Sequence, residues 1–118
     1  MNRYTPTRRA SVDALIRDAR AAEARGQFAT ALGLLEQAHV LGQQSTALHV
    51  RVHLQMLGLA WRNGWAGEAL GQGWRVLASA LATPFGLVPA GNPGSTRVGP
   101  FEAHPVAPAL RRLLDATR

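Results

Sequence analysis

The residues best suited to chemistry are histidines and a carboxylate that lie close together, between positions 36 and 53. Glu36 and His39 are three residues apart, and His49 and His53 are four apart. Residues at these spacings share one face of an α-helix, about one turn from each other. Imidazole nitrogens and carboxylate oxygens placed in this way bind divalent transition ions. The spacing therefore predicts a metal site shared by two helices.

Both pairs can reach one ion only if their helices are neighbours. Gly42 and the turn residues 43–45 separate the pairs, and a break this short joins two antiparallel helices. Glu68, farther along the chain, is a candidate fifth ligand, and Gln72 is a candidate outer partner one turn later. The predicted metal ligands are Glu36, His39, His49 and His53, with Glu68 as the fifth.

A ligand set without a thiolate suits zinc first, with nickel, cobalt, iron or copper as alternatives. The site is not the H-E-x-x-H motif of metalloproteases, because Val50 stands where that motif requires glutamate. A bridged di-iron centre would need a second Glu-x-x-His pair. Two other hypotheses stay open: histidines that only hydrogen-bond within the core, and a catalytic acid–base or haem-ligand role.

Hydrophobic periodicity predicts an all-α protein built from two antiparallel helical hairpins. Apolar residues recur at helical spacing, and a glycine or proline follows each of the four segments. The expected helices are 10–25, 28–41, 46–63 and 65–82. They form a four-helix core at 10–82, preceded by a basic lead-in at 1–9 and followed by a Pro/Gly-rich segment at 83–107 and a short helix at 108–118. We expect the Pro/Gly-rich segment to wrap around the bundle.

Several side chains are expected to pack inside this bundle. On the fourth helix the apolar stripe consists of Ala66, Ala69, Leu70, Gly73, Leu77, Ala80 and Leu81. The three tryptophans, Trp61, Trp65 and Trp74, are interpreted as packing residues. Gly71 and Gly73 indicate either the close approach of another backbone or a self-association face. His104 is expected to be exposed.

The two hairpins resemble each other. Residues 24–32, Ala-Arg-Gly-Gln-Phe-Ala-Thr-Ala-Leu, align with residues 62–70, Arg-Asn-Gly-Trp-Ala-Gly-Glu-Ala-Leu. This pattern resembles the helix–turn–helix unit of tetratricopeptide repeats, although the offset here is 38 residues. The resemblance implies a protein–protein interaction module, in which the His/Glu cluster would be purely structural.

A second resemblance covers residues 24–101. His39-Val-Leu-Gly-Gln43, His49-x-x-x-His53, Glu68-x-x-x-Gln72 and Val88-Pro-x-Gly-Asn-x-Gly94 together resemble an uncharacterised bacterial domain family with no established function. The resemblance implies a shared fold and recurrent positions, not an activity. Pro93 and Ser95 depart from the family's Gly-Asn-Thr-Gly-Gly pattern.

Length and composition set the remaining bounds. The 118 residues fit one domain, 1–118, and the absence of cysteine excludes disulfides, thiolate zinc fingers and iron–sulfur sites. The net charge is +6, but the arginines are scattered, which argues against a nucleic-acid partner. No segment has the length of a membrane span or the pattern of a secretory signal.

We expect a soluble cytoplasmic protein that buffers, senses or delivers a divalent ion, with a protein partner or a homodimer as further expectations. A non-enzymatic role is favoured, and an enzyme stays open because catalytic metal sites also have three protein ligands.

Overall fold

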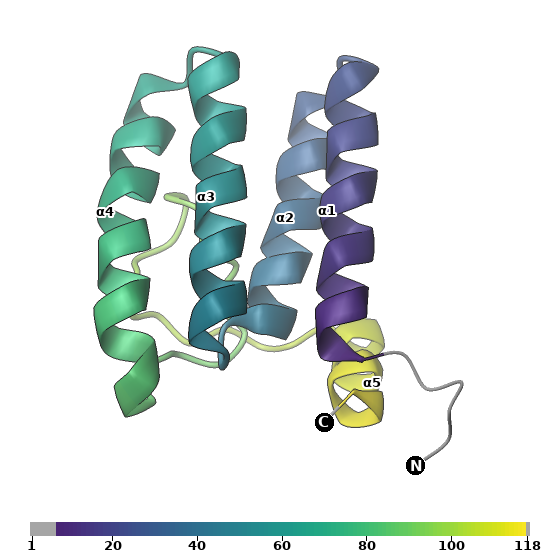
Figure 1. Ribbon diagram of the computed structural model, residues 1–118, viewed down its shortest axis with the longest axis vertical. Coiled ribbons are helices and arrows are strands. Elements are labelled where there is room, and N and C mark those ends of the chain that lie inside the picture. Colours follow the sequence, from purple (N-terminus) through teal and green to yellow (C-terminus); the bar gives the residue numbers. More distant parts are fainter. Residues whose placement is uncertain (1–6, 118) are drawn as a thin grey trace.

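The computed structural model describes residues 7–117, and these contain α-helices and no strand. Four long helices stand side by side, and a fifth, shorter helix lies across their lower end (Figure 1). The helices are α1 Arg8–Ala24, α2 Phe28–Gly42, α3 Thr46–Arg62, α4 Ala66–Ala82 and α5 Pro108–Ala116, with a 3-10 turn η1 at Thr83–Phe85. The predicted all-α class is confirmed, and α1–α2 and α3–α4 pack as the two predicted hairpins.

Local signals in the sequence set the helix ends. The side chain of Thr7 accepts a hydrogen bond from the backbone N of Ala10 at 3.0 Å, so α1 begins two residues before the predicted start. Ser45 caps α3 in the same way. Both hairpin turns contain a glycine in the left-handed region, Gly26 with φ 76° and Gly64 with φ 70°. In each turn the next residue donates its N–H at 2.9 Å to the carbonyl five residues earlier, so the sequence repeat is also a repeat of turn geometry.

The apolar core lies between α1, α2 and α3. Its buried members come from these three helices: Val12, Ile16, Ala19, Ala22, Ala31, Leu35, Ala38, Leu41, Val52, Met56 and Leu59. The partly buried residues that pack against this core include Trp65 and three leucines of α5. This core fixes the positions of α2 and α3, the two helices that carry the predicted histidine ligands.

The expected orientation of α4 is wrong. Its buried residues are Gln72, Arg75 and Ser79, all of them polar. Its apolar stripe faces outward instead: Leu70 is 78% exposed and Leu81 is 63% exposed. The polar face is turned inward because Gln72 and Arg75 hydrogen-bond to the loop between η1 and α5, and Gln72 also bonds to His53.

The interpretation of the tryptophans as packing residues holds only for one of them. Trp65 packs against the core, whereas Trp61 is 79% exposed and Trp74 is 59% exposed. The two exposed rings lie at the end of α3 and on the outer face of α4. Periodicity shows that an apolar residue lies on a helical stripe, but it does not show whether that stripe faces the core.

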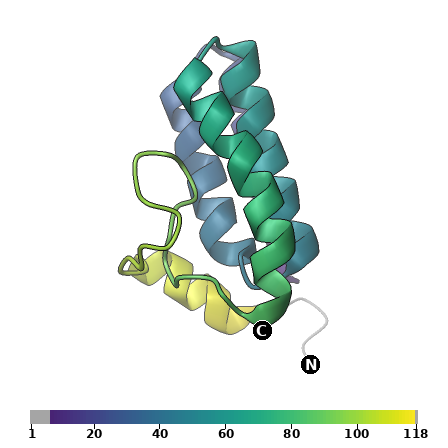
Figure 2. The ribbon, with the colours of Figure 1, turned by 90° about the vertical axis from the view of Figure 1, so that its left-hand side faces the viewer.

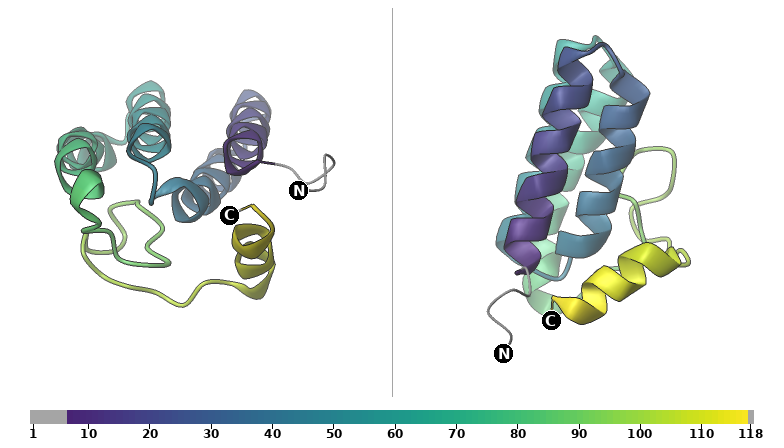
Figure 3. Two further views of the ribbon diagram at one scale, coloured as in Figure 1. Left: turned by 60° about the horizontal axis from the view of Figure 1, so that its bottom comes forward. Right: turned by 90° about the vertical axis from the view of Figure 1, so that its right-hand side faces the viewer.

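The segment between η1 and α5 lies in the recess between α2 and α4, on one side of α3 (Figures 2 and 3). The guanidinium of Arg75 donates to the carbonyls of Gly94, Ser95 and Val98, which ties this segment to α4. Gly71 faces the same segment, and a Cβ at this position would overlap the side chain of Thr96. The part of the self-association face expected at Gly71 is therefore covered by the chain itself, although Gly73 has open space around it. Within residues 7–117, no helix is both long enough and apolar enough to cross a membrane.

Candidate metal centre

Three histidine rings meet where the lower ends of α2 and α3 face each other. The Nε2 atom of His39, on α2, lies 2.9 Å from Nε2 of His49 and 3.1 Å from Nε2 of His53, both on α3. All three side chains are buried, with exposures of 3 to 7%. Ligands of a tetrahedral ion at about 2.0–2.1 Å lie roughly 3.3 Å from one another, so these separations are close to those of a metal site.

The other nitrogen of each ring has its own partner. The Nδ1 atoms of His39, His49 and His53 lie 2.6 Å from the carbonyl O of Asn92, 2.7 Å from Oγ1 of Thr83 and 2.6 Å from Oε1 of Gln72, respectively. Metal-binding histidines commonly donate this second N–H to a carbonyl, carboxylate or similar acceptor, which fixes the ring's orientation and tautomer. The partners come from η1, α4 and the loop, so three further elements orient rings carried by two helices.

These partners decide where the protons lie. The carbonyl of Asn92 only accepts, so His39 carries its proton on Nδ1. The Gln72 amide donates from Nε2 to Oε1 of Glu68 and to the carbonyl of Gly94, so its Oε1 is the atom left to accept from His53. Neutral His39 and His53 therefore direct two Nε2 lone pairs at each other across 3.1 Å. A hydrogen bond cannot hold that contact together, whereas a cation bound between the rings would.

Burial keeps the three imidazoles uncharged at neutral pH. Desolvation lowers the pKa of His49 and of His53 to about 4 each. It also lowers the pKa of His39 well below the ordinary value, and the neighbouring His53 and His49 lower it further. A neutral imidazole is the form that binds a metal ion. At neutral pH the three rings are thus ready to bind an ion without first losing protons.

The loop that supports His39 has a backbone suited to close packing. Gly94 has φ 87°, and a Cβ at this position would lie 2.6 Å from Cγ of the His39 ring. Asn92 stabilises the loop from within: its side chain accepts from the N–H of Gly94 and donates to the carbonyls of Gly99 and Glu102. The Gly-Asn-x-Gly sequence thereby places a backbone carbonyl on His39 Nδ1 and leaves room for the ring. The departures Pro93 and Ser95 leave both features intact.

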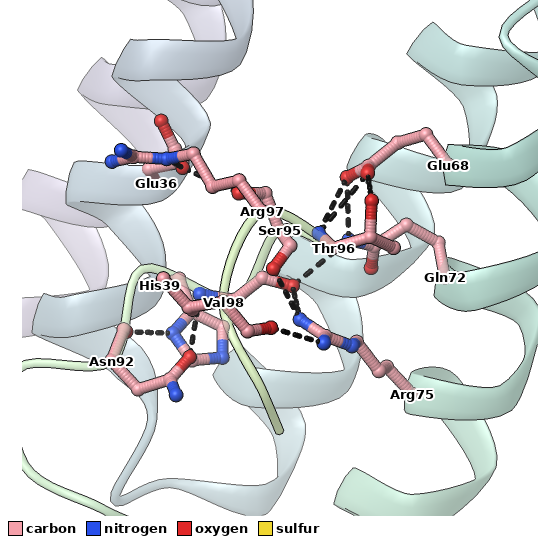
Figure 4. A network of polar contacts seen from close by, with 11 residues as sticks. Glu36, His39, Glu68, Gln72, Arg75, Asn92, Ser95, Thr96, Arg97 and Val98 are labelled. Atoms are coloured by element: carbon pink, nitrogen blue, oxygen red, sulfur yellow. Dashed lines mark hydrogen bonds and ion pairs between the residues drawn. The ribbon is translucent and has the colours of Figure 1, made fainter. Parts of the chain in front are cut away.

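The structure does not bring Glu36 to the histidines. Its carboxylate accepts from Oγ of Ser95 at 2.6 Å and from Nε of Arg97 at 2.5 Å (Figure 4). Glu36 lies one helical turn from His39 on the same face, but at that level the loop fills the space between α2 and α4. The predicted carboxylate ligand therefore anchors the loop.

Glu68 also lies outside the group. It accepts from Thr96, through both the backbone N and the hydroxyl, and from Nε2 of Gln72 at 3.1 Å. Figure 4 shows Glu68 beside Thr96 and Gln72. Gln72 in turn accepts from His53, so Glu68 is one residue removed from that ring. Among the described residues, the potential ligand group consists of His39, His49 and His53, with their nitrogen atoms within 4.8 Å of one another.

Several residues of the site were not identified from the sequence. Thr83 and the carbonyl of Asn92 orient two rings, and Arg75 and Gln43 line the small cavity beside them. Two of these residues lie in motifs that the sequence does show: Gln43 ends the His-Val-Leu-Gly-Gln sequence, and Asn92 lies in Val-Pro-x-Gly-Asn-x-Gly. His104, expected to be exposed, is half-buried, and its Nε2 has no hydrogen-bond partner among the described residues.

Comparisons with other proteins identify the family and no activity. No curated protein and no solved structure matches the chain. One family matches residues 6–114, nearly the whole chain, and its description states no function. The protein therefore belongs to the family described as "Protein of unknown function (DUF3703)".

Proposed function

We propose that this protein binds one divalent transition-metal ion through the Nε2 atoms of His39, His49 and His53. The observation that carries the proposal is the convergence of these three atoms while each Nδ1 is held by a separate partner. Purely structural histidines would satisfy one another by pairing a donor with an acceptor. Here at least two rings have no proton to offer on the facing nitrogen.

Zinc suits this donor set best, since it accepts three imidazoles in tetrahedral geometry without electronic preference. Copper, nickel, cobalt and ferrous iron are the alternatives that imidazole also suits. Because the three side chains are at least nine-tenths buried and each is fixed by a second partner, exchange of the ion requires the loop to move. We therefore favour long-lived binding, as in an ion buffer or sensor, over rapid delivery.

Metal analysis of protein purified without an affinity tag tests the proposal. We expect about one zinc ion per chain, and loss of stoichiometric metal on His49→Ala or His53→Ala, because two imidazoles cannot complete the set. His104→Ala is the matched control, since the fourth histidine lies outside the group and this variant should keep its metal. A wild-type protein that carries no stoichiometric ion after zinc-replete growth and reconstitution would end the proposal.

A second candidate is an interaction module of the tetratricopeptide-like kind. The outward apolar stripe of α4 favours it, because contiguous exposed apolar patches mark interaction surfaces. In this case the histidine group would serve only the fold. Sedimentation at rising concentration tests self-association through this stripe. Association that chelators leave unchanged and that Leu77→Glu abolishes would support it, and a monomer at all concentrations would exclude the homodimer.

A further inference from the structure

A small cavity lies beside the three histidines. Its volume is about 40 Å³, and all three histidines line it. Other residues also line it, among them Gln43 at the C-cap of α2, Arg75, Ala78 and Ala82 of α4, and Phe101 of the loop. One water molecule occupies about 30 Å³ in the liquid, and a cavity of about 10–15 Å³ already admits one. The space therefore suits a ligand of one to three heavy atoms.

An ion bound by three imidazoles in tetrahedral geometry keeps one open position. The described residues offer no fourth histidine or carboxylate to fill it, because Glu36 and Glu68 are bound to the loop. All three histidines line the cavity, so we place the open position on its side of the rings.

The charges around the cavity favour an anion there. Arg75 is 7% exposed and hydrogen-bonds to three backbone carbonyls, and among residues 7–117 it forms no ion pair. Burial lowers the pKa of Arg75, and the carboxylate of Glu68 opposes this effect without forming an ion pair with the guanidinium. With neutral imidazoles, a divalent ion would add two further positive charges. A small monoanion would offset part of this excess inside a region of low dielectric constant.

Gln43 offers a polar group beside the same space. It is 4% exposed, and its Oε1 has no hydrogen-bond partner among the described residues. A buried amide without a partner is destabilising, and a bound ligand or water commonly satisfies it. Gln43 is therefore suited to position a water or hydroxide at the open coordination site.

We propose, building on the proposed metal site, that the cavity is an exchangeable binding site for a small ligand on the metal. Water or hydroxide occupies it at rest, and monoanions of up to three heavy atoms replace it. The apolar walls at Ala78, Ala82 and Phe101 exclude larger anions. Gln43 acts as a positioning residue for the bound water or hydroxide, whose O–H its Oε1 can accept.

Cobalt-loaded protein tests this proposal, because the visible spectrum of Co²⁺ reports its coordination number and ligands. We expect the intense bands of four-coordinate Co²⁺, and a saturable spectral change with azide but none with benzoate at the same concentration. This comparison uses the wild-type chain, so it does not depend on whether a variant folds. If Co²⁺ and Zn²⁺ both fail to bind, the metal site itself is wrong. If Co²⁺ binds but azide leaves the spectrum unchanged, strips the ion, or acts no better than benzoate, only the ligand site is wrong.

Matched variants then locate the ligand. Ala78→Leu adds three carbons to the cavity wall and should weaken azide binding at least about tenfold while the ion stays bound. Ala80→Leu makes the same change two residues away, on the exposed side of α4, and should leave azide binding within about twofold. Gln43→Leu should change the resting spectrum, because the bound water or hydroxide loses its acceptor, and Gln43→Asn should restore part of the change. Equal effects of both alanine substitutions, or none from Ala78→Leu, would place the ligand elsewhere and overturn the proposal.

Discussion

Helices α1 and α4 have the same length but opposite relations to the interior. Each contains 17 residues; α1 begins the first hairpin and α4 ends the second. The buried residues of α1 are all apolar: Val12, Ile16, Ala19 and Ala22. Those of α4 are all polar: Gln72, Arg75 and Ser79. The outward apolar residues of α4 are Leu70, Trp74, Leu77 and Leu81, each more than half exposed.

The difference shows that two kinds of interaction orient the two helices. Burial of apolar surface against α2 and α3 orients α1. Hydrogen bonds orient α4: Gln72 binds His53 and the loop, and Arg75 binds three loop carbonyls. Buried polar groups are stable only when they have partners, and the loop supplies them. Helix α4 is therefore held by polar contacts with the histidine group and the loop, whereas α1 is held by the apolar core.

The largest expected difference between the two regions is in their response to acid, which should destabilise the histidine group and not the apolar core. The unfolded histidines have a pKa near 6.5, whereas those of folded His49 and His53 are about 4. Between these values the unfolded chain binds more protons, so stability is fully present above about pH 6.5 and is lost as the pH falls toward 4. We expect a loss on the order of 3 kcal/mol for each of the two histidines in metal-free protein. Urea unfolding after chelator treatment, at pH 7, 6, 5 and 4, measures it.

A substitution in the apolar core is the control for the effect of acid. Ile16→Val removes one methylene from the α1 core and should lower the free energy of unfolding by about 0.5–1.5 kcal/mol at every pH, leaving the pH slope unchanged. The His53→Gln variant should have a shallower slope than the wild type. Metal-free protein that is equally stable at pH 7 and pH 5 would contradict the burial of neutral imidazoles.

A larger cavity in the α1 core should destabilise the protein regardless of metal. Ile16 is 2% exposed, so Ile16→Ala should cost about 2–5 kcal/mol of unfolding free energy. The cost should be the same with zinc and with a chelator, because Ile16 belongs to the apolar core and does not line the cavity beside the histidines. Denaturant titrations under both conditions measure this. A metal-dependent cost would show that the two regions are coupled through α2.

Shortening a buried polar side chain of α4 should weaken metal binding. Gln72→Ala removes the acceptor for His53 Nδ1 and a link to Gly94, and changes of this kind reduce metal affinity about 10–100-fold. Competition with a chromophoric chelator gives the affinity. The matched control is Gln55→Ala, since Gln55 on α3 only accepts from exposed Arg20 and should leave the affinity unchanged. Unchanged affinity in Gln72→Ala would mean that His53 is not a ligand.

The sequence predicted what local rules determine. Helix ends followed from caps and left-handed glycines such as Gly26 and Gly64, which act within a few residues. The convergence of His39 with His49 and His53 followed from a short turn between two helices. Each of these features depends on residues close together in the chain.

The features that were not predicted from the sequence depend on contacts with the loop between η1 and α5. Glu36 was a reasonable ligand by its spacing from His39, but Ser95 and Arg97, some 60 residues later, bind it instead. The orientation of α4 was inverted for the same reason, because periodicity identifies an apolar stripe without revealing whether the opposite face has partners. One pattern was available: Gln72, Arg75 and Ser79 also recur at three-four spacing, and they mark a polar face suited to a buried site.

The smallest effect is expected on the outward stripe of α4. Leu81 is 63% exposed, so Leu81→Gln should change the free energy of unfolding by no more than about 0.5 kcal/mol and leave the metal content unchanged. Leu41→Gln is the contrasting substitution, because Leu41 is fully buried and the same change there should unfold the chain or nearly so. Thermal unfolding of both variants at several protein concentrations makes the comparison. If Leu81→Gln lowers the melting temperature by many degrees, and more so at high concentration, then the stripe is covered in solution by a second chain. In that case the burial of apolar surface would orient α4 as well, but within a dimer. Helices α1 and α4 would then differ only in what buries their apolar residues: the same chain for α1 and a second chain for α4.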